Sequence, residues 1–325
     1  MSSGAKPVGT TLVEPRTQEW LDQLAAAGGT PLYELSPQDA RDVLRGAQTS
    51  VPVEVMPADV EDRVIPGGPT GEVSIRIVKP QHTTDVLPVI VHSHGGGWIL
   101  GDKDTHDRLV RELANAARAA VVFVDYTPAP EAHYPVQNEQ AYTALEWVAA
   151  NAADFGGDPR RIALFGDSVG GNMTAALTLM AKQRSGPRIA AQVLFYPVTD
   201  ADLDTGSYRQ YAEGPWLTRA AMQWFWNAYL PDEKQRWEPT VSPLEASIDQ
   251  LRGLPPALVV TDDDVLRDEG EAYASKLAQA GVPVTQVRYG GTIHDFALLN
   301  PIADTPAPRA AIAQAGQFLR QHLGT

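Results

Sequence analysis

The sequence predicts an α/β protein with a mostly parallel, doubly wound sheet and a second layer of helices. Short apolar runs alternate with helical stretches through the middle of the chain, which is the pattern of successive β-α-β units. Runs such as Ala120–Val124 have no polar face, as expected of parallel strands that helices cover on both sides. An aromatic-rich segment, residues 200–242, interrupts the alternation and is expected to be a helical insertion.

Composition limits the possible partners. The 325 residues suggest two structural units, or one large domain with an elaboration, and 43% hydrophobic residues are enough for a large core. A formal charge of −14 repels phosphate backbones and anionic headgroups, so we expect neither nucleic acid nor a membrane as partner. The absence of cysteine excludes disulfides, Cys-ligated zinc, iron–sulfur clusters and thiol catalysis.

The N-terminal sequence predicts the compartment. Residues Met1–Pro7 lack the apolar core of a signal peptide, and no run approaches the ~18 apolar residues that cross a bilayer. We therefore expect a cytoplasmic protein.

The first fifty residues are expected to be helical. Apolar residues recur at helical spacing from Trp20 to Ala25 before Gly28 ends the pattern, and Ser36-Pro37 is a typical helix start. From Val51 the period changes to that of strands, which we expect at Val53–Val55 and Val73–Ile77.

The core elements follow in alternation. Strands are expected over Leu87–His92, Ala120–Val124, Ile162–Phe165, Ala191–Tyr196, Ala257–Thr261 and Val284–Tyr289. Helices are expected over Arg108–Ala117, Gln137–Asn151, Asn172–Lys182 and Glu271–Ala280. The α/β core would then occupy residues 59–199 and 243–325, and residues 1–58 would join the insertion 200–242 in the second layer.

The strongest chemical signal is Gly166-Asp167-Ser168-Val169-Gly170, between an expected strand and an expected helix. Such a sharp turn strains the serine backbone and projects the hydroxyl beyond the sheet, while the helix N-terminus favours negative charge beside it. A phosphate-binding turn is the alternative, but no lysine follows as it does in a P-loop.

A serine nucleophile needs a base and an orienting carboxylate. His294 follows the last expected strand, at the edge of the sheet that presents Ser168; an ordinary surface-loop histidine is the alternative. The carboxylate is expected between them, among Asp262, Asp263 and Asp264, and spacing alone does not choose one. These residues could also cap the following helix. The order Ser, Asp, His is that of α/β-hydrolases.

Three successive glycines follow the strand Leu87–His92 within His92-Ser93-His94-Gly95-Gly96-Gly97-Trp98. Their backbone N–H groups can approach a substrate oxygen closely, as an oxyanion-binding loop requires. The alternative is a metal site, since His-x-His at a strand end is a ligand spacing that His106 and His133 could complete.

Together these motifs, with Asp264-Val265-Leu266-Arg267-Asp268-Glu269-Gly270 and His294-Asp295-Phe296, resemble the hormone-sensitive-lipase family of bacterial carboxylesterases. The resemblance runs from about Val86 to the C-terminus. It implies an α/β-hydrolase fold with a helical cap, made from the N-terminus and the insertion.

The resemblance also assigns roles to residues. It places the catalytic acid at Asp264, the oxyanion donors at the N–H groups of Gly96, Gly97 and Val169, and a loop-shaping role at Gly95. It implies that His94 is structural. It implies neither a metal nor a cofactor, and a homodimer would be in keeping with it.

Two departures from the family pattern stand out. Val169 replaces the usual alanine and could crowd the oxyanion pocket. The usual Tyr-Arg-Leu-Ala-Pro-Glu stretch reads Tyr126-Thr127-Pro128-Ala129-Pro130-Glu131, so the ion pairing of the missing arginine is in doubt.

The expected function is a serine carboxylesterase that hydrolyses small-molecule esters with short to medium acyl chains. The triple-glycine loop also resembles that of esterases that accept bulky or tertiary alcohols, which implies room for such alcohols beside the carbonyl. Four aromatic residues are candidates for the substrate pocket, namely Trp98, Trp216, Trp224 and Phe225, although insertion aromatics could instead pack the cap. The alternatives are an amidase or lactonase with the same triad, and a hydrolase scaffold that only binds a ligand.

Overall fold

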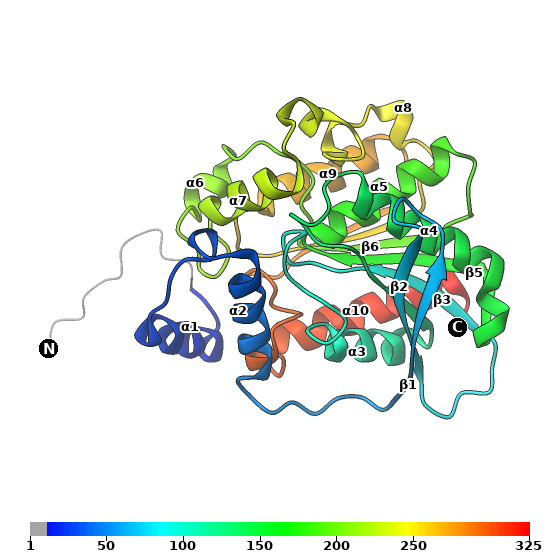
Figure 1. Ribbon diagram of the computed structural model, residues 1–325, viewed down its shortest axis with the longest axis horizontal. Coiled ribbons are helices and arrows are strands. Elements are labelled where there is room, and N and C mark those ends of the chain that lie inside the picture. Colours follow the sequence, from blue (N-terminus) through cyan, green and yellow to red (C-terminus); the bar gives the residue numbers. More distant parts are fainter. Residues whose placement is uncertain (1–11) are drawn as a thin grey trace, which may run out of the picture.

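An eight-stranded sheet forms the centre of the computed structural model, which describes residues 12–325 (Figure 1). The expectation for Met1–Pro7 lies outside the described residues. The strands are β1 Ala58–Pro66, β2 Glu72–Pro80, β3 Leu87–Ser93, β4 Ala120–Asp125, β5 Gly157–Asp167, β6 Ala191–Phe195, β7 Ala257–Thr261 and β8 Val284–Arg288. Their order is β1-β2-β4-β3-β5-β6-β7-β8. The pairs β1–β2 and β2–β4 are antiparallel and the others are parallel, so the predicted mostly parallel sheet is confirmed.

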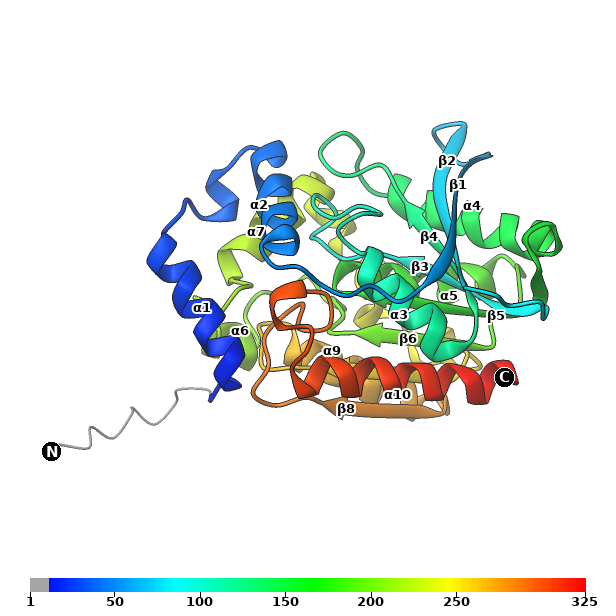
Figure 2. The ribbon, with the colours of Figure 1, turned by 90° about the horizontal axis from the view of Figure 1, so that it is seen from below.

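Helices cover both faces of the sheet. The α-helices are α1 Pro15–Ala27, α2 Pro37–Thr49, α3 Asp107–Ala117, α4 Val136–Asn151, α5 Val169–Gln183, α6 Gly206–Gln210, α7 Arg219–Tyr229, α8 Ile248–Leu251, α9 Arg267–Gln279 and α10 Pro306–Leu323. Short 3₁₀ turns are η1 Leu32–Glu34, η2 Ala152–Phe155, η3 Glu233–Trp237, η4 Pro243–Glu245 and η5 Asn300–Ile302. Helices α3 and α10 pack on one face, and α4, α5 and α9 on the other (Figures 1 and 2). Within residues 12–325, no helix combines the length and the apolarity that a bilayer crossing needs.

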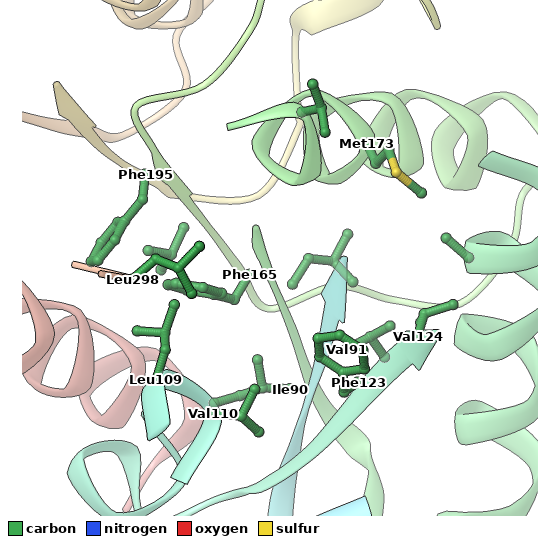
Figure 3. Packing of buried hydrophobic residues seen from close by; sticks show 14 of the residues in the cluster. Ile90, Val91, Leu109, Val110, Phe123, Val124, Phe165, Met173, Phe195 and Leu298 are labelled. Carbon is green, nitrogen blue, oxygen red and sulfur yellow. The ribbon is translucent and has the colours of Figure 1, made fainter. Parts of the chain in front are cut away.

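The core lies on both sides of the central strands (Figure 3). Leu109 and Val110 of α3 pack below them and Met173 of α5 above, against strand residues such as Phe123 and Phe165. All seven residues of β3 are buried, as expected of a strand covered on both faces. The parallel strands β3, β5, β7 and β8 end at one edge, and this brings the loops that follow them together.

Four helices gather beside that edge (Figures 1 and 2). We call α1, α2, α6 and α7 the helical cap; the first two come from the N-terminal region and the others from the insertion between β6 and β7. The rings of Trp20 in α1 and Trp216 in the insertion lie 5.2 Å apart, which links the two segments. The exact division of the chain into core and cap ranges stays a prediction.

The motif that lacks the family arginine is nevertheless ion-paired. Arg41 of α2 lies 2.6 Å from Glu131, and its Nε donates to the carbonyl of Ile99 at 2.8 Å. An arginine of the cap therefore supplies the pairing that the local sequence lacks.

The expected strand at Val53–Val55 is wrong. These residues are irregular, and β1 instead spans Ala58–Pro66. As an edge strand, β1 carries charged residues at Asp59, Glu61, Asp62 and Arg63, so it lacks the apolar alternation by which a strand is recognised.

Candidate active site

Ser168 lies on a sharp turn between β5 and α5, with φ 54° and ψ −122°. A positive φ is strained for a residue with a side chain. A Cβ atom on Gly166 would meet the carbonyl of Gly170, and one on Gly170 would meet the carbonyl of Ser93. Both glycines are therefore needed for the close approach that holds the turn.

The side chains of Asp264, His294 and Ser168 form a continuous hydrogen-bonded chain. Nδ1 of His294 donates to Oδ2 of Asp264 at 2.6 Å, and Nε2 accepts from the Ser168 hydroxyl at 2.9 Å. All three residues are buried, although they are far apart in sequence. An imidazole oriented in this way can remove the serine proton, which activates the hydroxyl as a nucleophile.

The three candidate carboxylates have different environments. Asp264 contacts His294 and also accepts from the amide of Leu266 at 2.8 Å. Asp263 points to the His294 loop instead, where it accepts from the amide of Gly291 at 2.7 Å. Asp262 is fully buried beside Asp264; burial, together with the Asp264 charge, raises the pKa of Asp262 well above its usual value.

His294 faces a second carboxylate that sequence reasoning missed. Oδ1 of Asp295 lies 3.5 Å from Nε2 of His294, and its Oδ2 accepts from the indole N–H of Trp216 at 3.0 Å. Burial alone would lower the pKa of His294, but Asp295 and Asp264 outweigh it and raise that pKa. Burial has the opposite effect on a carboxyl group, and it raises the pKa of Asp295. The only sequence signal was an acidic residue immediately after the candidate base.

The glycine loop after β3 offers free backbone donors. Gly96 and Gly97 have φ values of 108° and 63°, and their amides have no acceptor among residues 12–325. Both residues line a cavity with Ser168 and His294. Val169 is the first residue of α5, where an amide has no partner within the helix. The Gly95 amide is engaged differently, because it donates to Asp167 at 3.2 Å.

A buried carboxylate ties this loop to the serine turn. His92 and His106 donate to the two oxygens of Asp167 at 3.0 and 3.3 Å, and all three side chains are fully buried. Burial would raise the pKa of Asp167, but the two histidines outweigh it and hold that pKa well below its usual value. The same contact raises the pKa of His106 against its own burial.

The His-x-His motif does not gather into a ligand set. His92 and His106 turn to Asp167, whereas Nδ1 of His94 donates to the carbonyl of Gly95 at 2.8 Å. Burial lowers the pKa of His94 to about 3, so its ring is neutral. His133 lies at the surface and contacts the carbonyl of Ala228. These contacts favour a structural role for the motif over the metal alternative.

One group of potential ligands does converge within residues 12–325, namely Asp262, Asp264 and His294. Both ring nitrogens of His294 are already bonded, to Asp264 and to Ser168. This contact pattern suits a proton-transfer chain.

The cavity beside Ser168 and His294 has a volume of about 30 Å³ and apolar walls. Two of the four aromatic candidates, Trp216 and Phe225, line it, and Phe225 packs directly on Gly97. Trp98 is fully buried and stacks on Tyr229 with ring centroids 4.0 Å apart, outside the lining. Trp224 is also outside the lining, and its ring lies 5.2 Å from that of Phe225, its neighbour in α7.

Comparison with known proteins agrees with the fold and the site. A family model described as "alpha/beta hydrolase fold" matches residues 90–298. The carboxylesterase NlhH of Mycobacterium tuberculosis is 39% identical over 82% of this chain and 85% of its own length. A thermostable esterase from Pseudomonas putida is 50% identical, with a TM-score of 0.95 over 97% of this chain and 99% of that one. A fungal esterase from Rhizomucor miehei is 40% identical, with a TM-score of 0.90 over 96% and 97% of the two chains.

The fold and the hydrogen-bonded serine define the class of protein: an α/β-hydrolase. Within that class the comparisons agree with the family that the motifs resemble. The chain belongs to the hormone-sensitive-lipase-like carboxylesterase family of α/β-hydrolases.

Proposed function

We propose that this chain hydrolyses carboxylic esters through an acyl-enzyme on Ser168. The observation that carries the proposal is the chain of contacts from Asp264 to His294 at 2.6 Å and from His294 to Ser168 at 2.9 Å. Its membership of a carboxylesterase family supports the same activity.

In the acylation step, His294 takes the Ser168 proton as the oxygen attacks the ester carbonyl. Asp264 keeps the imidazole in the required tautomer and stabilises the imidazolium. The N–H groups of Gly96, Gly97 and Val169 receive the developing oxyanion; each such donor is worth about 3–4 kcal/mol of transition-state stabilisation.

The tetrahedral intermediate then breaks down. His294 gives its proton to the departing alcohol, which leaves the acyl group on Ser168. Water attacks this acyl-enzyme with His294 again as base; the bond from the acyl carbon to Ser168 Oγ then breaks, His294 returns the proton to that oxygen, and the carboxylic acid leaves. Apart from the ester and this water, each step uses side chains and amides of this chain.

The cavity supports small-molecule esters as substrates. Its apolar walls include Leu32, Leu100, Leu217 and Phe225, which suit a short to medium acyl chain rather than a charged one. The glycine loop has no side chains beside the carbonyl position, so we propose that bulky and tertiary alcohols are also accepted. A cytoplasmic location and a homodimer stay predictions.

Replacement of Ser168 by alanine tests the proposal. We expect Ser168→Ala to lower kcat for p-nitrophenyl butyrate by at least about 10⁴-fold, because the nucleophile is lost. The variant should keep its circular dichroism spectrum and should no longer react with a fluorophosphonate probe. Unchanged turnover would refute the assignment.

Two controls separate the alternatives. Wild-type protein that binds esters without turnover and without probe labelling would be a ligand-binding scaffold. Matched ester, lactone and amide substrates compare the remaining activities, and we expect the ester to be hydrolysed fastest because an amide nitrogen is a poorer leaving group.

A further inference from the structure

Trp216 separates two neighbouring apolar spaces. On one side lies the catalytic cavity of about 30 Å³, which contains Ser168 and His294. On the other lies a groove of about 380 Å³ between the cap helices, lined by residues that include Trp20, Leu24 and Val51. Trp216 and Val43 line both spaces, so these two side chains form the wall between them.

The wall is held in place from both sides. The Trp216 indole N–H donates to Asp295 at 3.0 Å, which anchors it to the loop that carries His294. Its ring lies 5.2 Å from that of Trp20 in α1, on the groove side. The backbone at Trp216 has φ +68°, a strained conformation for a residue with a side chain.

The difference in size between the two spaces has a consequence for substrates. Pockets for small molecules usually measure about 300–1,000 Å³. The groove is in that range and the catalytic cavity is far below it. Consider an ester whose carbonyl carbon lies beside the Ser168 hydroxyl. Its apolar chain reaches Trp216 after few carbon atoms, although apolar space continues behind the Trp216 ring.

We propose that Trp216, with Val43, sets the chain length that the enzyme accepts, by closing the catalytic cavity against the cap groove. This inference rests on the proposed ester hydrolysis. The occupant of the groove, once the wall is removed, is the apolar chain of the ester. That chain belongs either to the acyl group or to the alcohol.

The experiment compares kcat/KM across two substrate series. One series varies the acyl group, from p-nitrophenyl acetate to p-nitrophenyl decanoate. The other keeps acetate and varies the alcohol, from butyl acetate to octyl acetate, with acid release followed by titration. The variants are Trp216→Ala, Trp216→Phe and Val43→Ala; Trp237→Ala is the matched control, because that tryptophan of the insertion is 58% exposed and lines neither space.

We expect Trp216→Ala to raise the long-to-short ratio of kcat/KM at least about tenfold in one series, since each buried methylene favours binding several-fold. The series that responds identifies the chain that enters the groove. Trp216→Phe keeps most of the ring but loses the hydrogen bond to Asp295, so it should shift the ratio in the same direction by less than Trp216→Ala. Val43→Ala should shift the ratio in the same direction by less, and Trp237→Ala should not shift it.

Unchanged ratios in both series, with hydrolysis of the short esters retained, would overturn the inference and leave the proposed function intact. If the wild type does not hydrolyse p-nitrophenyl acetate, the proposed function itself fails. Thermal melting shows whether Trp216→Ala is folded; if it is not, Val43→Ala decides, because alanine is well tolerated in its helix.

Discussion

Oδ1 of Asp295 lies 3.5 Å from Nε2 of His294, so the ring nitrogen that faces Ser168 also faces a second carboxylate. This oxygen is buried and has no hydrogen-bond partner among the described residues. Its charge favours the imidazolium. The residue next to the proposed base therefore raises the pKa of that base, and it also contacts the cap through Trp216.

The first prediction concerns the pH dependence of the wild type. The pKa of His294 is raised, and only the neutral ring can accept the Ser168 proton. The acid limb of kcat/KM for p-nitrophenyl butyrate should therefore have its midpoint above about 6.5, the usual histidine value. A profile measured from pH 5 to 9 checks this, and a midpoint at or below that value would contradict it.

The second prediction is that Asp295→Asn moves this midpoint to lower pH. The amide removes the negative charge beside Nε2, while its oxygen can still accept from Trp216. The remaining carboxylates that act on His294, Asp264 and Asp167, are unchanged. Asp85→Asn, at an exposed position, is the control and should leave the profile as it is. An unmoved midpoint in Asp295→Asn would show that Asp295 does not tune the base.

The third prediction tests the oxyanion loop. Gly97 has φ +63°, and a Cβ atom there would overlap the Phe225 ring. Gly97→Ala should displace the loop and lower kcat by about 10²-fold or more, comparable to the loss of one oxyanion donor. Gly71→Ala is the matched control, because Gly71 also has a positive φ (+85°) but nothing near its Cβ position. Equal kinetics for the two variants would argue against an oxyanion role for this loop.

The fourth prediction concerns stability. Asp167→Asn leaves the buried His106 without its counter-charge, and breaking such a pair should lower the free energy of unfolding by about 3 kcal/mol. Urea unfolding measures the change. Asp59→Asn, on the exposed edge strand, is the control and should change stability by less than about 0.5 kcal/mol.

The pH dependence of that difference provides a further check. The lowered pKa of Asp167 gives stability that is present above about pH 4 and is lost as the pH falls. The raised pKa of His106 gives stability that is complete below about pH 6.5 and is lost as the pH rises through the folded value. The difference in the free energy of unfolding between wild type and Asp167→Asn should therefore be largest between these two pH values. A difference that does not depend on pH would contradict the ion pair.

Much of the fold could be predicted because several strands of the sheet consist mostly of apolar residues. Ala120–Val124 and Ala257–Thr261 were recognised within a residue of their observed ends, since burial on both faces leaves few polar positions. The edge strand β1 could not be recognised in this way. Its side chains are mostly exposed and charged, and only its pairing with β2 makes it a strand.

The site could be predicted only in part. The glycines around Ser168 are a local requirement of a sharp turn, so they are visible in the sequence. The choice of Asp264 among three neighbours depends on where β7 ends and which way the chain turns, and it came from family resemblance. The wall formed by Trp216 depends on how the cap packs against the His294 loop, and no short pattern encodes that contact.

Two different parts of the molecule meet around Ser168. The proposed catalytic groups follow strands of the sheet, whereas Leu32, Val43, Leu44 and Phe225 reach the cavity from the N-terminal region and the insertion. Substitutions at Leu32, Val43 and Leu44 should therefore change the accepted substrates more than the rate of hydrolysis of short esters. For a protein engineer, a library confined to Leu32, Val43 and Leu44 would vary the cavity walls and leave alone Phe225, which touches the glycine loop, and Trp216, which holds Asp295.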